Sequence, residues 1–432
     1  MKHFSFSYIL LCVLFFNCSS SPTITEEIIE EPILPIKPNI LLIIADDISK
    51  DVVPNYTEGI VKANMPTLSS LQTTGITFDN TWSYAVCTPT RASIFTGKYG
   101  IITGVIKVDD PISTSETSLQ QHINNNLNDA YATAIIGKWH LSRTATDPIT
   151  MGVDYYAGIL TGGIGNYYSW PLVENGVSST STEYATSKLT NLAINWMAAQ
   201  TKPWFLWVAY NAPHTPFHLA PEHLHNQGSL PTDDASINAN PLPYYISAIE
   251  ALDSEMGRLL NSMTTAEREN TIVIFVGDNG GPNRVIQTPY SRTTAKGSLY
   301  QGGINVPMVV SGAGVNRMGV RETALINTTD LYTTIGNIAG VNITDLNNSQ
   351  SFYGLLTDEN STKRDFVYSE KEDAYTVRNA TYKYIKFDDG SEELYHLIND
   401  AYEKDNLLET TLSIDAENAK VALIAEADRI RN

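Results

Sequence analysis

The sequence has little cysteine, few basic residues and no apolar run long enough to cross a membrane. Its 432 residues include only three cysteines, too few for a disulfide framework or a four-cysteine zinc site. Lysine and arginine number 28 against 47 acidic residues, so the formal charge is −19 and nucleic acid is excluded as a partner. Any anionic ligand must be held by a local basic cluster that acts against the field of the whole chain.

The N-terminal segment is typical of an exported protein. Lys2 precedes an apolar run of roughly ten residues, which is too short to span a bilayer as a helix. Residues 1–18 resemble a bacterial lipoprotein signal, so we expect Cys18 to carry a lipid anchor in the periplasm, on the outer membrane or at the cell surface. Simple cleavage and secretion is the alternative. Residues 19–38, rich in serine, proline and glutamate, are interpreted as a linker.

An alternation of strand and helix patterns predicts an α/β fold. Continuous apolar runs of strand length begin at Asn39 and recur at 133–137, 204–211, 271–277 and 307–311. Apolar residues spaced by three and four predict helices over 183–200 and 244–263. We therefore expect a mainly parallel central sheet flanked by helices, in one domain over residues 39–339.

The C-terminal part of the chain has a different pattern. Residues 366–397 alternate in polarity before an Asp-Asp-Gly turn at 388–390, which predicts an antiparallel hairpin. Residues 414–431 carry one apolar stripe at helical spacing. We interpret residues 340–432 as a small C-terminal α+β subdomain that contains an antiparallel sheet.

Acidic and amide side chains follow two of the expected strands. In open parallel sheets, ligands bind beyond the carboxyl ends of the strands. Asp46 and Asp47 follow the first apolar run, and Asp278 and Asn279 follow the run at 271–277. Their oxygen atoms are the ligands that Ca²⁺ or Mg²⁺ prefers. A helix cap at the first pair and an ordinary turn at the second are the alternatives.

Titratable and nucleophilic side chains follow other expected strands. Lys138 and His140 are two residues apart in an extended segment and point to one side, while prolines on both sides of His214 stiffen its loop. Cys87 begins an expected helix with Arg91 one turn further on, an arrangement that can activate a thiol. The structural alternatives are surface loops for the histidines and a buried, inert thiol for the cysteine.

Residues 87–97, CTPTRASIFTG, match the C-x-P-x-R signature of the formylglycine-dependent sulfatases, a family of the alkaline-phosphatase-like superfamily. Further matches follow in the family's order, at Asp46-Asp47, Gly137-Lys138-Trp139-His140-Leu141, Pro213-His214, Asp278-Asn279-Gly280-Gly281, Lys296-Gly297 and the tail segments 393–395 and 403–407. The resemblance covers roughly residues 38–410. It implies the superfamily's α/β fold and makes 39–339 the catalytic domain.

The resemblance also implies a nucleophile and a metal ion. In the family a maturation enzyme oxidises the signature cysteine to formylglycine (3-oxoalanine), whose hydrated aldehyde attacks sulfur; here that residue is Cys87. One Ca²⁺ per chain would be held by Asp46, Asp47, Asp278, Asn279 and the modified residue 87.

Five basic side chains complete the implied site, namely Arg91, Lys138, His140, His214 and Lys296. The arginine and the first lysine would stabilise the modified residue and the developing charge. His214 and Lys296 would hold the sulfate, one of them protonating the leaving alcohol. His140 would then take a proton from residue 87 so that sulfate leaves. A further polar residue that some members carry in the sulfate pocket has no match in 158–170.

The export signal and the resemblance together point to a sulfated polysaccharide or oligosaccharide as substrate. Aromatic rings that could stack on sugars occur at Tyr155, Tyr156, Tyr167, Tyr168 and Trp170, and packing within their own loop is the alternative. Arg284 and Arg292 could bind a second anionic group or be solvated. Two other functions stay open: a phosphonate or phosphate ester hydrolase of the same superfamily, and a catalytically dead, glycan-binding surface lipoprotein.

Overall fold

The computed structural model describes residue 1 and residues 37–432 with the exception of residue 344. The expected signal, its Cys18 and nearly all of the expected linker lie outside the described residues. Lys37–Asn432 form one compact unit. In the described part of the chain, no helix has the length and apolar character needed to cross a membrane.

A ten-stranded mixed sheet forms the centre of this unit. Its strands, in spatial order, are β10 (Val320–Asn327), β2 (Gly75–Trp82), β9 (Asn305–Gly312), β8 (Thr271–Gly277), β1 (Asn39–Ala45), β7 (Trp204–Ala209), β3 (Ala132–Lys138), β4 (Tyr155–Ile159), β5 (Trp170–Glu174) and β6 (Val177–Ser181). The block from β8 to β4 is parallel throughout, and β10 is parallel to β2. β9, β5 and β6 pair antiparallel with their neighbours. The predicted α/β fold with a mainly parallel central sheet is confirmed.

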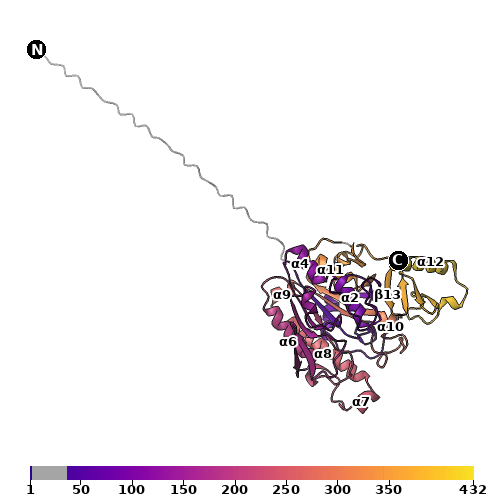
Figure 1. The fold of residues 1–432 in the computed structure, drawn as a ribbon, viewed down its shortest axis with the longest axis horizontal. Helices are drawn as coiled ribbons and strands as arrows, with labels where there is room; N and C mark the ends of the chain where they lie inside the picture. Colours follow the sequence, from indigo (N-terminus) through magenta and orange to yellow (C-terminus); the bar gives the residue numbers. More distant parts are fainter. Residues whose placement is uncertain (2–36, 344) are drawn as a thin grey trace. The chain divides into compact units, whose positions relative to one another are not determined.

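Helices cover both faces of this sheet. One face is covered by α1 (Pro66–Thr74), α6 (Ala185–Ala198) and α8 (Leu242–Asn261), and the other by α2 (Cys87–Thr96), α4 (Leu119–Leu127) and α11 (Asp330–Ala339). Leu41 and Ile43 of β1 pack on the first face, and Ile40 and Leu42 pack on the second. Because both faces are buried, β1 is apolar throughout. In Figure 1, α2, α4 and α11 are grouped on one side, with α6 and α8 on the other.

A second sheet, antiparallel throughout, lies in the C-terminal part. It consists of β13 (Val367–Lys371), β14 (Ala374–Arg378), β15 (Tyr382–Phe387) and β16 (Glu392–His396), in that order. The last helix, α12 (Ile414–Arg431), packs Leu423 and Ala427 against this sheet. α12 and β13 lie together in Figure 1, at the yellow end of the colour bar. The predicted C-terminal antiparallel sheet is confirmed, whereas the subdomain boundary near residue 340 stays a prediction.

The remaining elements are short. They are η1 (Lys50–Val52), α3 (Gly100–Thr103), α5 (Asp147–Thr150), η2 (Glu222–Leu224), α7 (Asp234–Ala239), α9 (Thr265–Glu269), α10 (Gln301–Ile304), β11 (Asp345–Leu346), β12 (Ser349–Gln350), η3 (Tyr353–Leu356) and η4 (Leu407–Glu409). β2 is not among the predicted strands, because polar residues such as Asp79 and Asn80 interrupt its apolar pattern.

Candidate active site

Four strand ends and one helix start bring the predicted site residues to one edge of the sheet. β8, β1, β7 and β3 are parallel neighbours, so their carboxyl ends lie together. In the sheet register, Ala45 lies opposite Gly277, and Ala209 lies opposite Gly137. Directly after these positions come Asp46, Asp47, Asp278, Asn279, Lys138, His140 and His214. The chain therefore gathers residues from distant parts of the sequence at a single edge.

Cys87 is the first residue of α2 and is buried. Its Sγ atom lies 3.2 Å from Nδ1 of His140. Burial raises the pKa of the Cys87 thiol, an effect that the Lys138 charge opposes and the Asp46 charge supports. Since only the thiolate is strongly nucleophilic, the unmodified side chain is a poor nucleophile at neutral pH.

Two buried ion pairs connect the strand ends beside residue 87. Nζ of Lys138 lies 2.6 Å from Oδ2 of Asp46, and Nη2 of Arg91 lies 2.7 Å from Oδ2 of Asp278. Nη1 of Arg91 also donates a hydrogen bond to the backbone oxygen of Lys138, at 2.9 Å. Burial alone would lower the pKa of Lys138, but the negative charges around it, of which Asp46 is the largest, together outweigh burial and raise that pKa above its usual value. Lys138 and Arg91 are thus held charged in spite of their burial.

Asp47 holds the basic residues that lie nearer to solvent. Nζ of Lys296 is 2.6 Å from Oδ1 of Asp47, and Nε2 of His214 is 3.7 Å from its Oδ2. The side chains of Lys296 and His214 are 21% and 19% exposed, whereas that of Asp47 is buried. The lysine and the histidine therefore face the open side of the site.

Oxygen atoms without hydrogen bonds indicate where a metal ion fits. Ligand atoms of Asp46, Cys87 and Asp278 lie within 4.8 Å of one another. Oδ1 of Asp46 and Oδ1 of Asn279 are buried and accept no hydrogen bond from any described residue. A buried oxygen of this kind is unfavourable unless a cation or a water molecule meets it. The donors are mainly oxygens, as Ca²⁺ requires, so the residues present fit the ion.

His140 is oriented as a proton acceptor toward residue 87. Its Nε2 lies 2.9 Å from Oδ1 of Asp109. With the hydrogen on Nε2 donated to that carboxylate, the lone pair of Nδ1 faces residue 87. Burial, together with the charges of Lys138 and Arg91, lowers the pKa of His140 to about 3. The imidazole is therefore neutral at neutral pH and can accept a proton.

The sulfatase family model matches residues 38–341, about 70% of the chain by residue number. The chain belongs to the sulfatase family. A second family model, described as N-sulphoglucosamine sulphohydrolase, C-terminal, matches residues 293–424. The first match contains every predicted site residue, and the second contains the antiparallel sheet of the C-terminal part. The family that the sequence motifs predict is therefore confirmed.

Relatives and solved structures agree with this membership. The chain is 29% identical over 371 residues to "Uncharacterized sulfatase YdeN" of Escherichia coli (strain K12), an alignment that covers 71% of this chain and 63% of YdeN. It is 26% identical over 415 residues to "Ulvan-active sulfatase" of Formosa agariphila, covering 88% and 79% of the two chains. The crystal structure of Ps i-CgsB in complex with k-i-k-neocarrahexaose has the same fold, with a TM-score of 0.76, 24% identity and coverage of 91% and 92%. The chain thus spans less than two thirds of YdeN.

Two further residues, Asp109 and Gly162, contact His140 and are not among the predicted site residues. Asp109 lies in a loop between α3 and α4 and reaches the histidine only in the folded chain; Nη2 of Arg143 contacts its other oxygen at 2.9 Å. Gly162 approaches the ring so closely that a Cβ there would lie 2.5 Å from Cε1 of His140. Only glycine permits this approach without displacing the ring. Neither residue belongs to a motif that sequence spacing could identify.

The aromatic residues considered for sugar stacking mostly pack inside the protein. Tyr156, Tyr167 and Trp170 are buried in the core, whereas Tyr168 is 42% exposed. The alternative, that these rings pack their own part of the fold, is correct for the three buried ones. Arg284 donates hydrogen bonds to the side chain and the backbone of Asn238, both at 3.0 Å.

Proposed function

We propose that this protein is a sulfuric ester hydrolase that removes sulfate from a sulfated carbohydrate. The position of residue 87 carries the proposal: it begins α2 in a buried site, 3.2 Å from His140 and beside the ion pairs of the strand ends. A protein that only bound glycans would have no need for a buried nucleophile position with a neutral histidine aimed at it.

In this proposal a maturation enzyme oxidises Cys87 to formylglycine, and the hydrated aldehyde supplies a hydroxyl as nucleophile. The raised pKa of the thiol supports this, because an unmodified cysteine would stay protonated at neutral pH. His140, with Nδ1 toward residue 87, accepts the proton that this residue releases. Asp109 holds the imidazole in the orientation and tautomer that this role requires.

A calcium ion fits among Asp46, Asp47, Asp278, Asn279 and residue 87, and when bound it would polarise the sulfate oxygens. The carboxylates of the site are already matched by cations, as the ion pairs show. A divalent cation therefore gives the site an excess of positive charge, which favours an anionic ester.

Lys296 and His214 are placed to meet the substrate from the solvent side. Their side chains are partly exposed and share the Asp47 carboxylate. An ammonium group here orients the sulfate by charge-assisted hydrogen bonds. A protonated group at the same place can also donate a proton to the leaving alcohol.

The substrate class is inferred from relatives and from the space beside the site. One relative is named for ulvan, and one similar structure holds a neocarrahexaose, which supports a polysaccharide or oligosaccharide substrate. A cavity of about 520 Å³ is lined by Gly297, the neighbour of Lys296, together with Lys107 and Lys371. This space is large enough for sugar units next to the ester.

Kinetics on three simple esters test the proposed reaction. Protein produced with its maturation enzyme should turn over 4-nitrophenyl sulfate with a higher kcat/KM than 4-nitrophenyl phosphate or a phenylphosphonate ester. A higher kcat/KM on a phosphorus ester would instead support the phosphonate or phosphate hydrolase. If mass spectrometry shows an unmodified thiol at Cys87 in natively produced protein and no ester is turned over, the catalytically dead, glycan-binding alternative is supported. If the sulfate ester is turned over, a desulfation screen on defined sulfated oligosaccharides would identify the sugar.

We also propose that the protein is exported and anchored through a lipid on Cys18, in the periplasm, on the outer membrane or at the cell surface. The basic start, the short apolar run and the cysteine that closes it support this. Metabolic labelling with a radioactive fatty acid should label the wild type and not Cys18→Ala. Equal labelling of both, or of neither, would contradict the anchor.

A further inference from the structure

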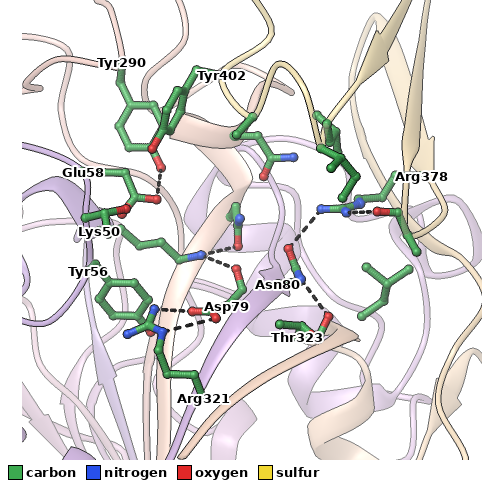
Figure 2. A pocket seen from close by; sticks show the side chains of 18 of the residues that line it. Lys50, Tyr56, Glu58, Asp79, Asn80, Tyr290, Arg321, Thr323, Arg378 and Tyr402 are labelled. Atoms are coloured by element: carbon green, nitrogen blue, oxygen red, sulfur yellow. Dashed lines mark hydrogen bonds and ion pairs between the residues drawn. The ribbon is translucent and has the colours of Figure 1, made fainter.

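A second cluster of basic side chains lies in a cavity that contains none of the candidate active-site residues. The cavity has a volume of about 730 Å³ and lies between β2, the neighbouring β10 and the C-terminal part of the chain. Its walls include Lys50, Arg321 and Arg378, and Figure 2 shows these side chains around Asp79 and Asn80. Local positive charge of this kind is notable in a chain with a formal charge of −19.

Lys50 is buried but bonded only to neutral oxygens. Its Nζ donates hydrogen bonds to the backbone oxygen of Asp79, at 2.6 Å, and to Oδ1 of Asn305, at 2.7 Å. In the described part of the chain, no carboxylate forms an ion pair with it. An ammonium group has three N–H donors, so one is left for a ligand.

Arg378, at the end of β14, is buried in the same way. Nε and Nη2 donate to the backbone oxygens of Asn379 and Ala380, and Nη1 donates to Oδ1 of Asn80, at 3.1 Å. These partners are also neutral. A guanidinium has five N–H donors, so two remain free. Since Asp79 and Asn80 are consecutive on β2, the two buried cations reach neighbouring positions of one strand, and in Figure 2 they extend toward it from opposite sides.

Nearby acids offset the burial of these two cations only in part. Asp79 is paired with the guanidinium of Arg321, whose Nε lies 3.3 Å from Oδ2. Glu58 accepts a weak hydrogen bond from the Tyr290 hydroxyl, at 3.4 Å. Burying a charge without a counter-charge is unfavourable, and burial accordingly lowers the pKa of Lys50 to about 8. An anion between the two cations would remove this penalty.

We propose that the cavity binds an oxyanion carried by a sugar, either a uronate carboxylate or a sulfate ester, with Lys50 and Arg378 as its charged donors. Hydroxyl groups of the sugar find partners on the same walls: Oε1 of Gln301 is buried and accepts no hydrogen bond from the described residues, and Thr323 is exposed at the cavity. The volume lies within the usual range of ligand pockets, roughly 300–1,000 Å³. The site does not depend on the proposed hydrolysis.

Substitutions at Thr323 test the charge requirement without removing a buried side chain. Thr323 contributes only its backbone oxygen to the hydrogen bond from Asn80. Sodium D-glucuronate, sodium sulfate and D-glucose are titrated calorimetrically into wild-type protein, Thr323→Glu and its uncharged control Thr323→Gln. Glucuronate should bind wild type and Thr323→Gln alike, at least fivefold more weakly to Thr323→Glu, and at least tenfold more tightly than glucose.

The sulfate titration distinguishes the two sources of the oxyanion. A loss of sulfate affinity in Thr323→Glu assigns the site to sulfate esters, and a loss confined to glucuronate assigns it to uronates. Equal affinities of the three proteins for both anions, or no binding of either to wild type, would overturn the proposal.

Arg378→Gln provides the second variant. It should weaken glucuronate binding at least tenfold while kcat/KM on 4-nitrophenyl sulfate stays within twofold of wild type, because Arg378 lies outside the candidate active site. Unchanged glucuronate affinity in a folded Arg378→Gln would count against the proposal. If the wild type turns over no sulfate ester, thermal unfolding serves as the folding control and the binding result stands independently of the proposed function.

Discussion

Two buried lysines, one in the candidate active site and one in the second cavity, are held in opposite ways. In the candidate active site, the ammonium of Lys138 lies 2.6 Å from the carboxylate of Asp46, whereas in the second cavity the ammonium of Lys50 meets only a backbone oxygen and an amide. Both lysines are buried. The pKa of Lys138 is nevertheless raised by the negative charges around it, Asp46 foremost, whereas burial lowers the pKa of Lys50 to about 8.

The difference shows how an acidic chain can prepare two kinds of anion site. At the sheet edge, positive and negative charges balance, so in the proposed function a bound metal ion would supply the excess positive charge that favours an anionic ester. In the second cavity, Lys50 and Arg378 hydrogen-bond only to neutral oxygens of the described residues, and nearby acids offset their burial only in part. We therefore expect anion binding to depend on metal content at the first site and to need no metal at the second.

The largest expected effect comes from removing the nucleophile. Cys87→Ser, produced with a maturation enzyme that oxidises only cysteine, carries no formylglycine, so kcat on 4-nitrophenyl sulfate should fall on the order of 10⁴-fold or more. Serine is close to cysteine in size, and the thermal unfolding temperature should therefore change little. Sustained multiple turnover by Cys87→Ser would refute residue 87 as the nucleophile.

Asp278→Ala removes the charge balance of the active site. The substitution takes away one oxygen ligand and leaves the guanidinium of Arg91 without its 2.7 Å partner. We expect calcium content, measured by plasma mass spectrometry, to fall, and kcat/KM to decrease about 10²–10³-fold. Asp278→Asn is the matched control, because its amide oxygen can still accept the backbone hydrogen bond from Asp47. Full calcium content in Asp278→Ala would contradict the assigned metal site.

Asp109→Asn tests whether the carboxylate acts through His140. Loss of the charge should let the imidazole adopt the other tautomer, so kcat should fall roughly 10–100-fold while KM changes little. Asp110→Asn is the matched control, since the neighbouring carboxylate accepts backbone hydrogen bonds from Ile106 and Lys107 instead. A similar decrease in both variants would mean that the loop as a whole, and not the Asp109–His140 contact, is responsible.

The sequence predicts those parts of the molecule in which neighbouring residues act together. The buried central strands and the site residues just after them can be predicted, because an apolar run and the polar residues that follow it are adjacent in the sequence, as in Ala45-Asp46-Asp47. Asp109 and Gly162 cannot be predicted as site residues, because their role depends on a contact with His140 that forms only in the folded chain. The second cavity is the extreme case, because Lys50 and Arg378 lie in no sequence motif. They are brought together by hydrogen bonds to neighbouring residues of β2, a strand that the sequence pattern does not predict because polar residues interrupt it.

The smallest expected effect is on stability, through Lys50→Met. Burial lowers the pKa of Lys50, the charges of Glu58 and Asp79 oppose this, and those of Arg321 and Arg378 add to it. At pH 7 the lysine is protonated in the folded and unfolded states, so the folded state bears the full unfavourable free energy of the buried charge. Between the folded pKa of about 8 and the usual value of 10.5, the folded state releases its proton first.

The free energy of unfolding of the wild type should therefore rise with pH across this window, relative to Lys50→Met, by about 2 kcal/mol. Denaturant titrations of both proteins at about pH 7, 8.5 and 10 measure the difference between their free energies of unfolding. The contributions of other ionising groups cancel in this difference, because both proteins contain those groups. Saturating glucuronate should flatten the dependence, since a bound anion compensates the charge at neutral pH. If the difference in unfolding free energy between the wild type and Lys50→Met does not change with pH in the absence of ligand, the charge of Lys50 is already compensated within the fold, as that of Lys138 is. The contrast between the two lysines would then disappear.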